Sequence, residues 1–159
     1  MPSTGEWVML AYRMRREPSS GRVTVWRKLR RLGALQIVDG LVTLPRDRRT
    51  QEQFEWLADA IIEAGGESSL WFSRPATAGQ EGALRAQMSA AAAEDYRQLI
   101  GEVNQLLAIN ERIDRRTVAR LTRELDRIRR RDYYPPPEKD RAVRAIERLA
   151  AVVAEDVGV

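Results

Sequence analysis

The sequence predicts an α+β fold, in which a β-α-β-β-α-β unit is followed by a three-helix C-terminal appendage. Three observations predict it. Apolar runs of strand length alternate with two amphipathic segments over about the first 75 residues. An Asp39-Gly40 pair separates two of these runs, as in a tight hairpin. Beyond the linker that follows, apolar residues recur only at helical spacing. We therefore divide the chain into residues 1–75 and residues 76–159.

The first strand and the first helix are predicted over residues 6–12 and about 20–32. The strand segment is mostly apolar. Ser19 or Ser20 can cap the helix, and Gly33 can adopt the left-handed backbone that ends it. At about 100° per residue, one stripe of this helix is apolar, and it consists of Val25, Trp26, Leu29 and Leu32.

A hairpin is predicted next. Leu35-Gln-Ile-Val38 and Leu41-Val-Thr-Leu44 flank the Asp-Gly pair, and Pro45 ends the second strand. Asp-Gly between two β-type runs is a strong short-range signal for a tight primed turn.

The second helix begins with Thr50-Gln-Glu-Gln53, which fits a capping box. Its predicted apolar face consists of Phe54, Leu57, Ala58, Ile61 and Ile62. Gly65-Gly66 ends the helix, and residues 67–73 are predicted to be the last strand. This order of elements describes a ferredoxin-like unit, a four-stranded antiparallel sheet with both helices on one face. We expect three tryptophans, Trp7, Trp26 and Trp71, to pack in or near its core.

The appendage is predicted to hold three helices after a short polar linker at 76–80. The first has a long apolar stripe made of Leu84, Met88, Ala92, Leu99, Val103 and Leu106. The second, about 112–131, has a heptad-like stripe made of Val118, Leu121, Leu125 and Ile128. The third, about 138–156, buries Val143, Ile146, Leu149 and Val153. These helices either pack in the same compact unit or form a dimerisation element.

Composition excludes several classes of function. The chain has no cysteine and no histidine, so ordinary zinc, haem and iron–sulfur sites lack ligands. Ser-His-Asp and Cys-His catalysis are excluded, while an oxygen-ligand Mg²⁺ site stays open. We therefore expect that the protein is not an enzyme and that it has no cofactor, no metal site and no catalytic residue. The start lacks the pattern of a signal peptide, and no apolar run approaches the roughly 20 residues that cross a bilayer. We therefore expect a cytoplasmic protein without a membrane partner.

The positive charge is concentrated at the front of the chain. The net charge is +4, but residues 1–49 hold 11 basic and 4 acidic side chains, while residues 50–110 hold 3 basic and 9 acidic ones. Such asymmetry favours a polyanion as the partner of the front. The alternative interpretation is a solvated face whose arginine stems cover apolar surface. The candidate residues for contacting the polyanion are Arg13, Arg15, Arg16, Arg22, Arg27, Lys28, Arg30, Arg31, Arg46, Arg48 and Arg49.

A second basic stretch covers residues 115–131. Eight arginines there are interleaved with acidic residues, and most can pair at three- and four-residue spacing. This pattern favours a solvated, salt-bridged face.

The sequence resembles the amino-terminal domain of ChrB, the chromate-resistance regulator. The matching features are Trp7 in a first apolar strand, Pro18-Ser-Ser, Val25-Trp26-Arg27, the Asp39-Gly40 hairpin and Arg131-Asp132-Tyr133-Tyr134. The resemblance spans most of the chain and is densest over residues 6–70. It implies a bacterial transcription regulator that contacts double-stranded promoter DNA, with a homodimer as the expected form. The family's chromate-responsive part usually follows this domain, and we expect it to be lacking because the sequence ends at Val159.

Other functions remain open. One is a non-catalytic interaction module that acts with a separate sensor protein. Another is capture of an oxyanion such as chromate by the arginine cluster. A more remote resemblance, to the ferredoxin-like endoribonucleases of CRISPR adaptation, implies an aspartate after the tyrosine that ends the first strand. Here Arg13 follows Tyr12, and a guanidinium repels a metal cation, which argues against nuclease chemistry.

Overall fold

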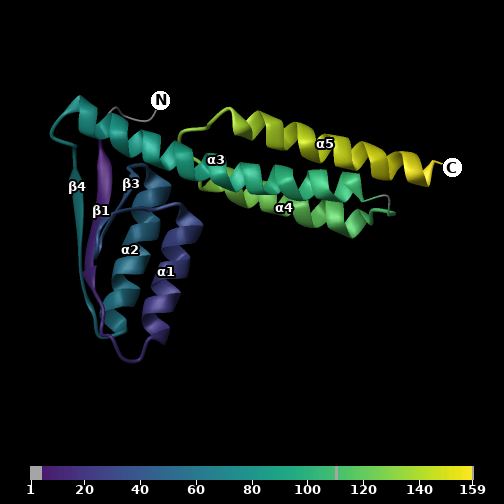
Figure 1. The fold of residues 1–159 in the computed structure, drawn as a ribbon. Helices are drawn as coiled ribbons and strands as arrows, with labels where there is room; N and C mark the ends of the chain where they lie inside the picture. Colours follow the sequence, from purple (N-terminus) through teal and green to yellow (C-terminus); the bar gives the residue numbers. More distant parts are fainter. Residues whose placement is uncertain (1–4, 110, 159) are drawn as a thin grey trace. The chain divides into compact units, whose positions relative to one another are not determined.

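The computed structural model describes residues 5–109 and 111–158, and its ribbon is drawn in Figure 1. The chain divides into two compact units, Met1–Gln87 and Met88–Val159, which we call the first and the second unit. The division lies inside one long helix. The described residues form a four-stranded antiparallel sheet and five helices, so the predicted α+β class is confirmed.

The first unit contains the sheet. Its elements are β1 (Trp7–Arg13), α1 (Ser20–Leu32), β2 (Leu35–Val38), β3 (Leu41–Pro45), α2 (Arg48–Glu63) and β4 (Glu67–Ser73). The strand order is β2-β3-β1-β4, and every neighbouring pair is antiparallel. Helices α1 and α2 lie side by side along the same face of this sheet (Figure 1).

Alternation along β1 explains which side chains enter the core. Val8 and Leu10 are fully buried, and their register partners on β3, Leu44 and Val42, are buried with them. Successive residues of a strand point to opposite faces, so these four share one face of the sheet. The helices complete this core with Val25, Leu29, Phe54, Leu57 and Ile61.

Two of the three tryptophans predicted for the core are exposed. Trp7 is 2% exposed, as expected, but Trp26 is 58% and Trp71 is 61% exposed. Trp26 is turned about 100° around α1 from Val25, which places it at the edge of the apolar stripe. Trp71 pairs with Met9, on the opposite sheet face from Leu10. Ile62, predicted for the apolar face of α2, is also exposed.

The helix starts differ from prediction in two places. Gly33 ends α1 with φ 74°, as predicted, although Ser19 precedes the helix without a side-chain capping bond. The capping box of α2 lies three residues earlier than predicted. The Asp47 carboxylate accepts a bond from the Thr50 amide at 2.7 Å, and the Thr50 hydroxyl accepts one from the Asp47 amide at 2.9 Å. Thr50 is therefore the third helical residue and not the cap.

The predicted hairpin joins β2 to β3, and Gly40 at its tip has φ +79°. The Tyr12 amide donates to the Gly40 carbonyl at 2.8 Å. A Cβ on residue 40 would lie 2.6 Å from the Tyr12 carbonyl oxygen. Only glycine fits the turn at this close approach to β1.

The second unit is built from most of α3 (Ala78–Ala108) together with α4 (Arg115–Arg130) and α5 (Glu138–Val157). Its core contains residues of the predicted apolar stripes, namely Leu99, Val103, Leu121, Leu125, Ile128, Ile146 and Leu149. The fully buried Tyr96 donates its hydroxyl hydrogen to Asp132 Oδ2 at 2.7 Å. Among the helices of the described residues, none combines the length and the apolar character needed to cross a membrane.

Candidate nucleic-acid interface

Helix α1 separates apolar from cationic side chains. Val25 and Leu29 are buried under it, whereas Arg27, Arg30 and Arg31 are exposed on its other side. None of these three arginines makes an ion pair with any residue in the described part of the chain. The Arg30 guanidinium makes a cation–π contact with Trp26, and its carbon lies 5.6 Å from the centre of the ring. The helix thus presents unneutralised positive charge beside an exposed indole.

A groove of about 800 Å³ lies between the first half of α1 and the β2–β3 hairpin. Its wall includes Tyr12, Arg16, Arg22, Trp26, Gln36 and Asp39. Arg22, Trp26 and Arg30 are spaced four residues apart, so they lie above one another along one side of α1. The groove therefore combines guanidinium groups with two aromatic rings, the groups that bind phosphates and stack on bases.

Electrostatics in the groove favour an anion. Burial raises the pKa of the Tyr12 phenol, and nearby Arg22 lowers it while Asp39 raises it. The phenol stays protonated at neutral pH and can donate a hydrogen bond. Asp39 is the only acidic residue in the groove wall described here, and one of its oxygens accepts a bond from Gln36 Nε2 at 2.9 Å.

Two predicted site residues are engaged in ion pairs. Arg13 donates to Glu67, its register partner on β4, at 2.6 Å. Arg46 pairs with Glu6 at 3.1 Å, and its guanidinium carbon lies 3.7 Å from the centre of the Phe72 ring. Both have a carboxylate partner that offsets part of their charge, and their contact with a polyanion stays a prediction.

The predicted residues lie at two ends of the sheet. Arg15 and Arg16 follow the end of β1, and Arg22 lies in the first turns of α1 at that same end. Arg48 and Arg49 begin α2 at the other end, because the Arg46 amide bonds to the Glu6 carbonyl at the start of β1. Seven residues of strand separate the ends by roughly 20 Å. Arginines of α1 extend between them, so the structure does not gather all eleven residues into one cluster.

The remaining predicted residues have mixed surroundings. Lys28 faces α2, in a hollow that also contains Leu57 and Ala60. The hollow beside Arg48 is lined by four carboxylates, Glu6, Asp47, Glu52 and Glu55. Arg16, Arg22, Arg27, Arg30 and Arg31 make no ion pair with a residue that the structure describes, and Asp39 shares the groove wall with Arg16 and Arg22.

Sequence reasoning missed Tyr12 and Trp26 as members of this site. The available signal was the i, i+4 ladder of Arg22, Trp26 and Arg30, in which an aromatic ring stands between two guanidinium groups. Within residues 5–109 and 111–158, no group of three or more acidic side chains is placed to hold a metal ion.

Comparison with known families gives one result. Residues 22–156 match the family model described as "Protein ChrB, N-terminal". The match begins inside α1 and extends into α5, so it covers both units. No curated protein and no solved structure matches the chain.

Proposed function

Because the chain belongs to the family of ChrB N-terminal regions, we propose that it is a DNA-binding transcriptional regulator of the chromate-resistance type and has no enzymatic activity. In this proposal α1 and the adjoining groove contact double-stranded DNA. The family supports the regulatory role, and the charge arrangement of α1 supports the place of contact.

The observation that carries the proposal is the set of unpaired arginines on the exposed side of α1. Arg27, Arg30 and Arg31 lack an ion-pair partner among the described residues, whereas Arg13 and Arg46 have carboxylates beside them. A surface salt bridge already lowers the charge that a phosphate would meet, so only the unpaired arginines attract a polyanion at full strength.

The chemistry of these side chains fits duplex DNA. An arginine can donate two parallel hydrogen bonds to a phosphate or to the O6 and N7 acceptors of guanine. An α-helix fits the major groove, where the four base pairs present distinct patterns. Arg16 and Arg22 at the start of α1 would then contact the backbone beside that groove.

We also propose that the first unit has the ferredoxin-like arrangement. The β-α-β-β-α-β order and the antiparallel strand order β2-β3-β1-β4 support this assignment. In such a unit the outer side of α1 points away from the sheet and is available to a ligand. A homodimer would repeat this surface, and it stays a prediction.

The test is fluorescence anisotropy with a labelled duplex from upstream of the gene and a scrambled duplex of equal length, over a salt series. The variant carries Arg27→Gln, Arg30→Gln and Arg31→Gln. The matched control carries Arg97→Gln, Arg120→Gln and Arg127→Gln, which removes the same charge from arginines that are ion-paired. We expect preferential, salt-sensitive binding that the α1 variant loses and the control keeps. Equal binding by all three proteins would remove α1 from the interface.

A second candidate function is a protein-interaction module that acts with a separate sensor protein. Trp71 and Val38 favour it, because both are about 60% exposed on the sheet face opposite to the core. This alternative requires that neither duplex binds even at low salt. A stable complex with the sensor, weakened by Trp71→Ser, would then support it.

A further inference from the structure

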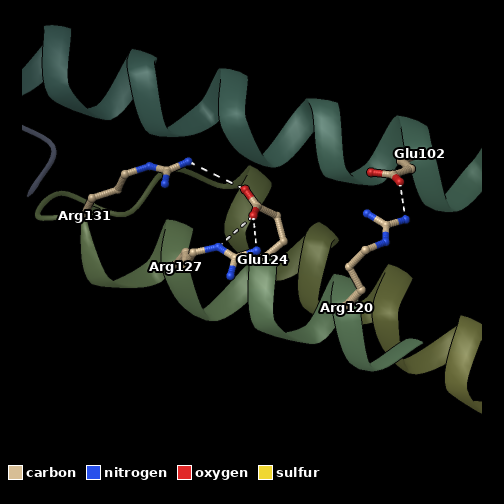
Figure 2. Close-up of polar contacts among 5 residues, drawn as sticks. All are labelled: Glu102, Arg120, Glu124, Arg127 and Arg131. Carbon is tan, nitrogen blue, oxygen red and sulfur yellow. Dashed lines mark hydrogen bonds and ion pairs between the residues drawn. The ribbon is translucent and has the colours of Figure 1, made fainter. Parts of the chain in front are cut away.

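Six arginines of residues 116–131, which belong to α4 or to its C-cap, form two groups that differ in their ion-pair partners. The buried face of the helix is formed by Leu121, Leu125 and Ile128. On one flank of that face, three arginines pair with carboxylates, as Figure 2 shows in part. Arg120 contacts Glu102 of α3 at 2.6 Å, Arg127 contacts Glu124 at 2.7 Å, and Arg131 contacts Asp95 of α3 at 3.1 Å.

The sequence predicted ion pairs on this helix at three- and four-residue spacing. Of the three arginines, only Arg127 pairs in that way, with Glu124. Arg120 pairs with α3, and Arg131 pairs both with Asp95 of α3 and, at 4.0 Å, with Glu124 of α4 itself (Figure 2).

The side of α4 that is opposite to its buried face carries Arg116, Arg123 and Arg130, next to the row of Arg120 and Arg127. All three are exposed, and none makes an ion pair with a residue that the structure describes. They are seven residues apart, close to two helical turns, so they form one row with steps of about 10.5 Å. We call this row the α4 arginine stripe. Asp126 lies near its second and third members without an ion pair to either, so the stripe keeps a net positive charge.

We propose that the α4 arginine stripe is a second DNA-contacting surface, carried by the second unit and separate from α1. This inference rests on the proposed function, because it takes DNA as the polyanion. The stripe extends over about 21 Å of helix. Duplex DNA carries one phosphate charge per about 1.7 Å of its axis, so roughly 12 charges lie alongside such a length. Phosphates are spaced more closely than the three arginines, so each guanidinium group can contact a phosphate without an exact match between the two spacings.

The chemistry of α4 favours nucleic acid over a membrane surface. A helix that binds a bilayer needs a free apolar face to insert, and the apolar face of α4 is already buried in the core of the second unit. Every cationic side chain of α4 is an arginine, the side chain that binds phosphate with two parallel bonds. Contacts of this kind position the protein and do not select a base sequence.

The experiment compares salt dependence in four full-length proteins: wild type, the α1 variant, the paired-arginine control described above, and Arg116→Gln/Arg123→Gln/Arg130→Gln. Binding of one duplex is measured from low to moderate salt, and matching circular dichroism spectra establish that each variant is folded. Three lost phosphate contacts reduce the slope of log K against log salt by about 2.7, and weaken binding roughly 100-fold near 0.15 M salt. The paired-arginine control should keep the wild-type slope.

The outcomes separate the two proposals. The loss of one phosphate contact lowers the slope of log K against log salt by roughly 0.9. A smaller reduction than this in the stripe variant overturns the inference. If the α1 variant is weakened at the same time, the proposed function survives. If wild-type protein binds no duplex at low salt, the proposed function fails and the stripe loses its partner. An equal loss of slope in the paired-arginine control would show a general charge effect and would also overturn the inference.

Discussion

Replacing Tyr96 by phenylalanine should destabilise the second unit by an amount that depends on pH. The Tyr96 hydroxyl donates to Asp132 Oδ2 at 2.7 Å, and the backbone of Tyr134 also hydrogen-bonds this carboxylate. A hydrogen bond to a charged group contributes about 1.5–3 kcal/mol, and a neutral bond about 1 kcal/mol. We therefore expect Tyr96→Phe to lower the free energy of unfolding by about 2 kcal/mol at pH 7.

The pH dependence follows from the carboxyl group. Burial raises the pKa of Asp132, while the Tyr96 hydroxyl and Lys139 lower it. Removing the hydroxyl raises the folded-state pKa further above the unfolded value, so the variant recovers stability as pH falls and Asp132 takes up a proton. The loss should shrink toward about 1 kcal/mol as pH is lowered from 7 to 4, in the direction in which Asp132 takes up a proton and the missing bond becomes a neutral one.

Urea unfolding, followed by circular dichroism at 222 nm, measures the loss of unfolding free energy at each pH. Hydrogen exchange of peptides from α4 shows whether that loss of stability lies in the second unit. The matched background is Asp132→Asn, in which the same Tyr96→Phe change should cost about 1 kcal/mol at either pH. A loss below about 0.5 kcal/mol at pH 7, or a larger loss at pH 4 than at pH 7, would refute the reasoning.

Four further predictions concern a turn, a position within α3, a helix cap and alkaline pH. Gly40→Ala should lower the free energy of unfolding by at least about 1 kcal/mol, since φ is +79° and the new Cβ would lie 2.6 Å from a backbone oxygen. Gly82→Ala, in open space on α3, should raise it by up to about 1 kcal/mol, and thermal unfolding that ranks the two variants alike would contradict both expectations. Asp47→Ala removes the bond to the Thr50 amide and should cost about 1 kcal/mol by urea unfolding; an unchanged midpoint would mean that the cap is dispensable. Burial and Asp132 raise the pKa of Tyr96 well above 10, so the folded chain keeps this proton where the unfolded chain loses it. Stability should therefore fall as pH rises above about 10, and Tyr96→Phe should flatten that fall.

Periodicity predicted the fold because packing follows it directly. The alternation in β1 and the 3.6-residue stripes of α2 and α4 place Leu10, Phe54 and Leu121 in the cores where they are observed. The errors occurred where the pattern is ambiguous. Trp26 lies at the edge of a stripe, where an aromatic ring can turn inward or outward. Thr50-Gln-Glu-Gln53 matches the usual Ser/Thr-x-x-Glu/Gln pattern, whereas the capping box that forms has Asp47 as the cap and Thr50 in place of Glu or Gln.

The sequence predicted which arginines belong to the candidate site, but it did not predict which of them form ion pairs. The sequence shows how many arginines α1 carries, yet it cannot show that Arg13 meets Glu67 across a strand pair, or that Arg46 meets Glu6. These contacts join residues more than 35 positions apart, which helical spacing rules do not cover. The same limit applies to Arg120, whose partner Glu102 belongs to the preceding helix.

The positions of the tryptophans determine which events intrinsic tryptophan fluorescence can detect in this protein. Trp7 is screened from water, whereas Trp26, Trp56 and Trp71 are each about 60% exposed. Tryptophan fluorescence of the native chain therefore comes mostly from indoles that are already hydrated. Denaturation should shift the wavelength of maximum emission only a little. The same arrangement makes the chain a built-in probe of its surface. A ligand that covers Trp26 changes the surroundings of an indole flanked by Arg22 and Arg30, and the signal needs no attached dye.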